Sequence, residues 1–135
     1  MTRIDATKVW SLNYRLLSTV IAGVAPQVAE LGLEVKELFV LAAIDEHPHP
    51  AELAQELSLP KPTVTVYLKR LGIAEFVRRE IDAGDLRRHR LTLTPLGRKV
   101  MTRGLGLLAE AFAERLSRLS ATERVQLATL LEKLN

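Results

Sequence analysis

Hydrophobic periodicity changes once along this chain, and that change limits the folds open to it. Up to residue 71, apolar side chains recur every three or four positions, which predicts helices. Between residues 76 and 93 the period is two, which predicts a pair of strands. Thr94-Pro95 then fits an N-cap followed by the first helical position, and the helical period returns. The pattern therefore predicts a mainly α protein with one small β-hairpin.

Proline and glycine residues divide the helical stretches into separate elements. The two prolines of residues 47–50 keep that segment out of a helix, and Gly32 ends the first helix. Pro26 falls in the last turn of that helix, where we expect a kink or an early end. Residues 120–123 fit a capping box before the last helix. The predicted helices cover residues 6–29, 34–46, 51–57, 61–71, 95–116 and 121–134, and the predicted strands cover residues 76–81 and 89–93, joined by a charged loop over residues 82–88.

Basic charge is concentrated in the middle of the chain. Residues 61–99 carry ten basic and four acidic residues, whereas residues 1–60 carry four basic and eight acidic ones. The whole chain has a net charge of only +3, so the basic zone is local. One basic zone between acidic or near-neutral zones is typical of a protein that binds a polyanion. The alternative is a solvated face whose charges pair locally.

The basic zone coincides with two short helices joined by a tight turn and followed by the hairpin. In a helix-turn-helix, the second helix lies in the major groove of DNA. Apolar positions fix the inner face of helix 61–71, which leaves Lys61, Thr63, Thr65, Val66 and Lys69 outward. Arg87 on the hairpin is a candidate for the minor groove, with Asp85 orienting it. The candidates for phosphate contacts are Arg78, Arg88 and Arg90.

From residue 50 to residue 97 the chain resembles the MarR family of bacterial winged-helix transcription regulators. The resembling residues are Ala51-Glu52-Leu53-Ala54-Gln55-Glu56-Leu57, Thr63-Val64-Thr65 with Arg70-Leu71, Asp85-Leu86-Arg87, and Leu91-Thr92-Leu93-Thr94-Pro95-Leu96-Gly97. The resemblance implies a winged helix-turn-helix of six helices in an intertwined homodimer with two DNA-reading wings.

Two positions depart from the family's pattern. Many members carry a polar or basic residue where this chain has Val66, so base contact at this position is in doubt. A glycine usually precedes the first wing strand, but Glu75 stands there, with Gly72 earlier. We therefore expect this connection to be shaped differently.

The terminal helices carry broader apolar faces than one small domain can bury, which favours an interface over a self-contained helical core. We expect one chain unit, 1–135, with a DNA-binding region over residues 34–93. Dimerisation helices are expected over residues 6–29 and 95–135. A two-fold dimer would place two recognition helices ~34 Å apart on a palindromic site.

Aromatic residues are few, and two of them lie four positions apart on the first helix. Trp10 and Tyr14, with Arg15 beside them, are candidates for binding a small aromatic or anionic effector, because members of the resembling family often sense phenolic compounds. The alternative is aromatic packing within a dimer. His47, His49 and His89 make a weak metal candidate, and an exposed loop is the expected setting of the first two. We expect no metal and no cofactor.

Several functional classes fit poorly. The chain has no cysteine, so thiolate metal sites and disulfides are excluded. It also lacks phosphate-binding loops and nucleophile motifs, so an enzyme is not expected. No signal core or membrane-length apolar run is present, and we expect a cytoplasmic protein.

The predicted function is that of a sequence-specific, double-stranded DNA-binding transcriptional regulator. It is expected to be a ligand-responsive repressor that acts as a homodimer on a pseudo-palindromic operator. The alternative is a winged-helix interaction module that binds an acidic protein partner.

Overall fold

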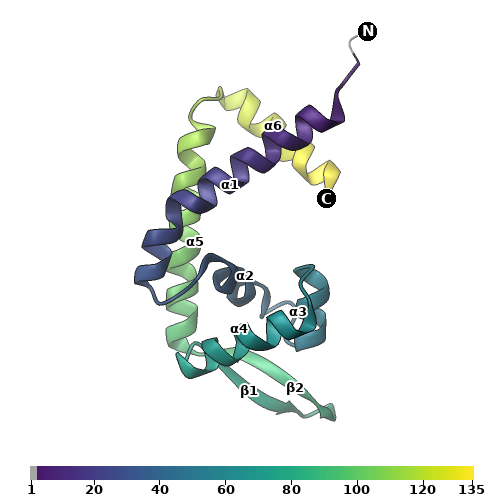
Figure 1. Ribbon diagram of the computed structural model, residues 1–135, viewed down its shortest axis with the longest axis vertical. Helices are drawn as coiled ribbons and strands as arrows, with labels where there is room; N and C mark the ends of the chain where they lie inside the picture. Colours follow the sequence, from purple (N-terminus) through teal and green to yellow (C-terminus); the bar gives the residue numbers. More distant parts are fainter. Residues whose placement is uncertain (1–2) are drawn as a thin grey trace. The chain divides into compact units, whose positions relative to one another are not determined.

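The computed structural model describes residues 3–135 as six helices and one two-stranded antiparallel sheet (Figure 1). This confirms the expected fold class and the order of its elements. The elements are α1 (Ala6–Glu30), α2 (Val35–Ala43), α3 (Pro50–Glu56), α4 (Lys61–Ile73), β1 (Val77–Asp82), β2 (Asp85–Leu93), α5 (Pro95–Leu116) and α6 (Ala121–Leu134).

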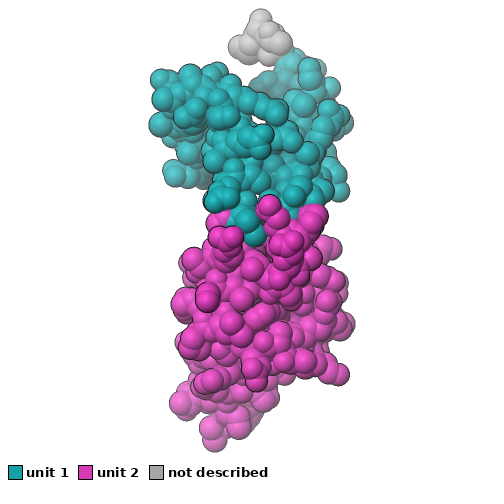
Figure 2. Space-filling model, turned by 90° about the vertical axis from the view of Figure 1, so that its left-hand side faces the viewer, with its two compact units in different colours: residues 1–24, 107–135 teal, residues 25–106 magenta. Residues whose placement is uncertain are grey.

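The chain forms two compact units, which Figure 2 shows in different colours. The first, unit 1, holds the chain up to Val24 together with Leu107–Asn135. The second, unit 2, holds Ala25–Gly106 and therefore α2, α3, α4 and the hairpin. Both boundaries fall inside long helices, so α1 and α5 contribute residues to each unit.

The core of unit 2 is built around α2. Leu38, Val40 and Leu41 are completely buried, together with Ile44 just after the helix. Val35 and Leu38 face inward, whereas Ala42 is exposed. The other elements of the unit each contribute buried apolar side chains: Val28, Leu33, Leu53, Val64, Leu68, Leu71, Phe76, Val77, Leu91 and Val100.

Three helices differ in length from the sequence prediction, and α4 is the simplest case, since it runs two residues further than predicted, to Ile73. α1 continues through Pro26 to Glu30, so the expected early end is wrong. A proline this close to a helix C-terminus removes only one backbone hydrogen bond, which the remaining turns tolerate. The helix ends at Gly32, whose φ is +83°, a conformation that costs glycine little. α2 ends three residues early because Ile44 closes its last turn on the carbonyl of Leu41.

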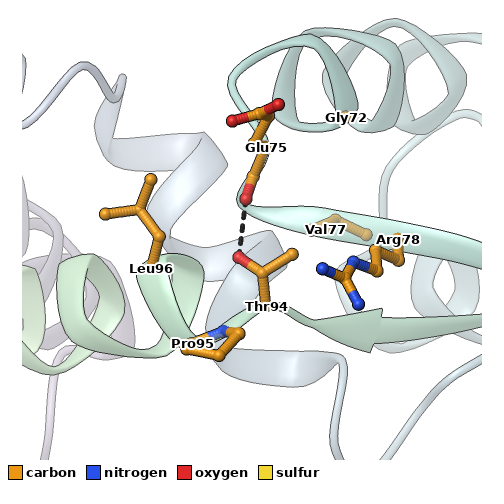
Figure 3. A pocket seen from close by; sticks show the side chains of 7 residues that line it. All are labelled: Gly72, Glu75, Val77, Arg78, Thr94, Pro95 and Leu96. Atoms are coloured by element: carbon orange, nitrogen blue, oxygen red, sulfur yellow. Dashed lines mark hydrogen bonds between the residues drawn. The ribbon is translucent and has the colours of Figure 1, made fainter.

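A tight junction joins α4, β1 and the start of α5 (Figure 3). The Thr94 hydroxyl donates to the carbonyl oxygen of Glu75 at 2.6 Å and accepts from the Gly97 N–H at 2.9 Å. Thr94 is therefore the N-cap of α5, as its sequence position indicates. The Thr94 N–H also donates to the carbonyl of Phe76 at 3.0 Å. These bonds fix the path by which the chain enters and leaves the hairpin.

Glu75 occupies the left-handed conformation that glycine favours. Its φ is +64°, and its N–H closes the end of α4 on the carbonyl of Gly72 at 3.0 Å. The connection therefore has the left-handed backbone conformation that a glycine adopts readily, although a glutamate stands there. Contacts at the junction hold this conformation despite the side chain that Glu75 carries.

Replacing Glu75 by glycine is expected to raise the free energy of unfolding by about 0.5–1 kcal/mol. Glycine removes the energetic cost of the left-handed backbone conformation in the folded state. Its greater conformational entropy in the unfolded chain offsets part of that gain. Urea unfolding followed by circular dichroism measures the change. Glu75→Ala is the matched control, since it removes the carboxylate and keeps the unfavourable backbone conformation. Equal stability of the two variants would contradict the prediction.

Unit 1 has little core of its own. Its buried apolar residues, among those described, are Val20 and Val24, whereas α6 has none. A capping box starts α6: the Ser120 hydroxyl accepts from the Glu123 N–H at 3.2 Å, and the Ser120 N–H donates to the Glu123 carboxylate at 2.8 Å. The latter bond lowers the pKa of Glu123 because it stabilises the ionised carboxylate.

The search for membrane-spanning segments covers the described residues. None of their helices is, by itself, long and apolar enough to cross a bilayer; α1 and α2 meet the criteria only as a bent pair, by length and composition.

Candidate nucleic-acid interface

α3 and α4 form a helix-turn-helix whose second helix is held by its inner face. Val64, Leu68 and Leu71 are buried in the core of unit 2. The turn between the helices closes when the Leu59 N–H donates to the Ala54 carbonyl at 3.0 Å, and it passes through Ser58 at a φ of +53°. The remaining face of α4 is therefore available to a ligand.

The outward face of α4 carries the residues that the sequence predicts there. Lys61, Thr65, Val66 and Lys69 are exposed, and Thr63 is half-buried. The Thr65 hydroxyl donates to the Lys61 carbonyl at 3.0 Å, so its oxygen remains free to accept. Val66 is 55% exposed and gives the face one apolar point, which suits a thymine methyl better than a polar base edge.

The hairpin is longer and its tip is tighter than the sequence prediction. β1 and β2 pair antiparallel in one register from Val77↔Leu93 to Ile81↔His89, where the register shifts, and Asp82↔Asp85 closes a tip of Ala83-Gly84 alone. Residues 85–88 therefore belong to a strand, and the expected loop over residues 82–88 is wrong. The physical reason is capping by acidic side chains: Asp82 accepts from the Gly84 N–H at 2.8 Å.

Asp85 acts on the backbone of Arg87. Its carboxylate accepts from the Arg87 N–H at 3.0 Å, and no ion pair joins the two side chains among the described residues. Asp85 therefore contacts the main chain of Arg87 and not its guanidinium, and its role in orienting that side chain stays a prediction. The Arg87 side chain itself is exposed, as are those of Arg78 and Arg90.

Three basic side chains of the central zone are neutralised by the acidic N-terminal zone. Arg88 pairs with Glu52 at 3.0 Å, and Arg98 pairs with Asp45 at 3.0 Å. The hydrogen bond from Arg98 to Asp45 raises the pKa of the guanidinium. Arg70 lies 3.3 Å from Glu34 and 3.6 Å from the buried carboxylate of Glu37. The basic residues without an ion pair within residues 3–135 are, in this zone, Lys61, Lys69, Arg78, Arg79, Arg87, Arg90 and Lys99.

These pairings leave the positive charge where a polyanion can reach it. Six of these charges lie on the outward face of α4 and along the hairpin, and Lys99 lies on α5, all within one compact unit. Arg88 was a phosphate candidate by sequence, but in this structure its guanidinium is bound to Glu52. That pair joins residues 36 positions apart, and no local sequence pattern could have shown it.

The histidines do not form a metal site. No group of three or more metal-ligating side chains occurs within the described part of the chain. His47 lies 3.5 Å from Glu56, while His49 is only 9% exposed and faces the hairpin. The expected exposed loop is therefore wrong for His49, a residue whose role sequence analysis missed.

Trp10 and Tyr14 stack on each other in unit 1. Their ring centroids are 6.1 Å apart with an interplanar angle of 29°. Both remain open to solvent, at 63% and 61% exposure, and Arg15 is exposed beside them. The structure thus brings the two aromatic effector candidates into contact on the surface, and Arg15 follows Tyr14 on the same exposed helix.

Two surface hollows of unit 2 are lined entirely by described residues. One of about 500 Å³ is lined by Gly72, Glu75, Val77, Arg78, Thr94, Pro95 and Leu96, the residues drawn in Figure 3. The other, of about 480 Å³, is mainly apolar with two cationic side chains, and it is lined by Leu31, Leu96, Lys99, Val100, Thr102 and Arg103. An apolar hollow with cations suits a small aromatic anion.

Comparisons with known proteins agree on one family. Residues 31–88 match the MarR family. The chain is 30% identical over 125 residues to the HTH-type transcriptional repressor Rv2887 of Mycobacterium tuberculosis, covering 91% of this chain and 90% of that protein. The crystal structure of Rv2887 with salicylic acid superposes with a TM-score of 0.75 at 29% identity, over 92% of this chain and 93% of that one. Wild-type apo MarR from E. coli shares the fold, with a TM-score of 0.80, 23% identity and 98% coverage of both chains.

Proposed function

Because this chain belongs to the MarR family, we propose that it is a sequence-specific, double-stranded DNA-binding transcriptional regulator that represses as a homodimer on a pseudo-palindromic operator. Its relatives over nine-tenths of its length are named transcriptional repressors. One observation carries the proposal: of the seven basic residues of the central zone that have no ion pair among residues 3–135, six lie on the outer face of α4 and on the hairpin.

α4 supplies the major-groove contacts of this proposal. Lys61 and Lys69 reach guanine or phosphate, and Thr63 and Thr65 reach base edges or phosphate. The hairpin supplies the others, with Arg87 entering the minor groove while Arg78 and Arg90 meet phosphates. Arg88 can contact a phosphate only if it breaks its ion pair with Glu52. It therefore contributes less to DNA affinity than Arg78, Arg87 and Arg90.

Fluorescence anisotropy with a duplex from the region upstream of the protein's own gene tests this function. The upstream duplex is expected to bind roughly 10³-fold or more tightly than a scrambled one, with an affinity that falls steeply as salt rises. Equal, weak binding to both duplexes would rule out autoregulation and require selection of sites across the genome. A lack of binding at low salt would overturn the DNA proposal.

That last outcome would favour the alternative partner, an acidic protein that binds the same basic surface. The comparisons support the regulator over this alternative, since the named relatives are repressors. For the same reason we propose a binding protein rather than an enzyme.

We assign residues 34–93 to DNA binding and the helices over residues 6–29 and 95–135 to dimerisation. Unit 1 supports this division because it exposes far more apolar surface than it buries. Contiguous exposed apolar faces mark interaction surfaces, and a second copy of the chain supplies a matching face by symmetry. The large apolar side chains exposed in this unit are Ile4, Val9, Trp10, Leu12, Tyr14, Leu17, Val125, Leu130, Leu131 and Leu134.

A charge placed on this face is expected to dissociate the dimer. Leu130 is 56% exposed and lines an apolar groove of about 460 Å³ with Val125 on α6. Leu130→Lys is expected to reduce the mass in light scattering from twice 15.0 kDa to 15.0 kDa, because a buried leucine contributes about 1.5–3 kcal/mol and a buried lysine opposes association. Ile73→Lys, at a 74% exposed site in unit 2, is the control that should remain dimeric.

We also propose that the regulator responds to a small aromatic carboxylate. Rv2887, the relative described above, has been crystallised with salicylic acid and with p-aminosalicylic acid. The stacked Trp10 and Tyr14 with Arg15 form one candidate wall for such an effector. The hollow that Lys99 and Arg103 line is a second candidate, which its apolar surface and two cations support.

Calorimetric titration with salicylate distinguishes the two candidate sites, of which the first is the Trp10 and Tyr14 wall and the second is the hollow beside Lys99 and Arg103. Trp10 is the only tryptophan, so salicylate bound at the first place should quench its fluorescence, and Arg15→Ala should abolish the binding heat. Binding at the second place should be lost in Lys99→Ala and Arg103→Ala while Trp10 emission stays unchanged. The absence of heat in the wild-type protein would overturn the salicylate proposal.

A further inference from the structure

We propose that His49 is the positioning residue of the wing: its imidazole fastens both hairpin strands to the start of the helix-turn-helix. This inference rests on the proposed function for its consequence at DNA, but the contacts that carry it lie within unit 2. His49 immediately precedes α3 as its N-cap, with extended backbone and no capping bond from its side chain. The ring is turned toward the hairpin instead.

One imidazole contacts both strands. Nδ1 lies 3.0 Å from the carbonyl oxygen of His89 on β2, and Nε2 lies 3.3 Å from Oδ2 of Asp82 at the end of β1. Both partners are acceptors, so a contact needs an N–H on the ring nitrogen that faces it. The His49 and Asp82 side chains are only 11% and 19% exposed, which shields the pair from water.

Asp82 extends this contact to the wing tip. Its other oxygen, Oδ1, accepts from the Gly84 N–H at 2.8 Å and so shapes the two-residue turn. Asp85 follows that turn and holds the Arg87 N–H at 3.0 Å. A continuous series of short contacts therefore leads from His49 through the turn to the backbone of Arg87.

The helical end of this series is rigid. Pro48 and Pro50 flank His49 and restrict the backbone on both sides. The Pro48 carbonyl accepts from the Leu91 N–H at 2.7 Å, which joins the same segment to β2. Residues 83–90, in contrast, are all exposed, and a two-stranded ribbon alone is marginally stable in water. Without the His49 contacts, the strand pairing and the half-exposed Arg88–Glu52 ion pair would remain to fix the direction of the tip.

Amide hydrogen exchange of the full-length protein tests the inference without DNA. The Leu91 amide is the direct reporter, because its partner is the carbonyl beside His49, and the Leu68 amide in α4 reports on the rest of the unit. His49→Ala is expected to speed exchange at Leu91 and along β2 by roughly five- to tenfold, the value of one or two lost hydrogen bonds, and to leave Leu68 unchanged. Equal acceleration at both amides would overturn the inference, because it would mean general destabilisation.

Two further variants sharpen this test. His89→Ala is the matched control, since His89 offers only its backbone carbonyl to His49, and wild-type exchange is expected. His49→Gln keeps one side-chain donor and is expected to restore part of the protection. An apolar His49→Leu that protects the wing as well as histidine does would show that packing is sufficient, and it would overturn the inference.

A double-mutant cycle with Arg87→Ala carries the test to DNA. If His49 acts by placing Arg87, His49→Ala weakens operator binding by roughly five- to tenfold in the wild type and hardly at all in the Arg87→Ala background. Equal losses in both backgrounds would overturn the link to Arg87. If the wild type binds no duplex, the proposed function fails, while the exchange experiment still decides whether His49 holds the wing.

Discussion

Arg87→Ala is expected to weaken binding to the operator by roughly 10- to 100-fold, the equivalent of about 1–3 kcal/mol for a groove-inserted arginine. Arg87 lies three residues after the hairpin turn, exposed and free of ion pairs among the residues that the structure describes. The Asp85 carboxylate fixes its backbone, so the side chain is presented from a defined strand position. The minor groove attracts arginine most strongly where it is narrow. The loss should therefore be greatest on operators with A·T-rich flanks, measured by anisotropy at one salt concentration.

Arg79→Ala is the matched control for this prediction. The Arg79→Ala substitution removes one positive charge from the same hairpin, as Arg87→Ala does. Arg79 is next to Arg78 on β1. Because adjacent residues in a strand point to opposite faces, Arg79 points away from the face that carries Arg78. Its loss should reduce affinity slightly and equally on all duplexes, as a diffuse charge effect. The prediction fails if Arg79→Ala weakens binding as much as Arg87→Ala does and if neither loss depends on the flanking sequence. In that case the wing contributes only non-specific electrostatic attraction.

Local patterns predicted the elements that depend on local physics. The Thr94-Pro95 start of α5 and the box between Ser120 and Glu123 are short-range hydrogen-bonding arrangements, and both are present. Alternation of apolar residues located the strands, but it could not show that acidic side chains would tighten the turn and lengthen β2 to Asp85. A sequence period measures which face is buried, not where a hairpin turns.

Long-range contacts are what sequence analysis could not supply. Arg88 is 36 residues from Glu52, and His49 is 40 residues from His89, so their pairing depends on how the whole unit packs. The backbone conformation of Glu75 is a second feature that the sequence did not predict. The sequence indicated an unusual residue at a position where glycine is common, but only the observed φ of +64° shows that the junction imposes the left-handed conformation regardless. The site residues were therefore easier to locate than the contacts that orient them.

Gly97→Ala is expected to be the most damaging single-methyl change in unit 2. An added Cβ would overlap the carbonyl oxygen of Phe76 and lie 2.7 Å from its carbonyl carbon. That backbone cannot move aside, because the same oxygen accepts from the Thr94 N–H and the Phe76 N–H is bound to the Leu71 carbonyl, each at 3.0 Å. Overpacking against a fixed backbone costs about 3 kcal/mol or more, the upper end of the usual range.

Urea unfolding by circular dichroism measures the loss, and operator binding should fall with it because the junction joins the wing to α5. Gly72→Ala is the control within the same unit, since a Cβ there meets nothing within 4 Å. That change should stabilise α4 by up to about 1 kcal/mol through helix propensity alone. A Gly97→Ala protein as stable as Gly72→Ala would mean that β1 and α5 do not approach each other as closely as described, and the positions derived for the wing would fail with that contact.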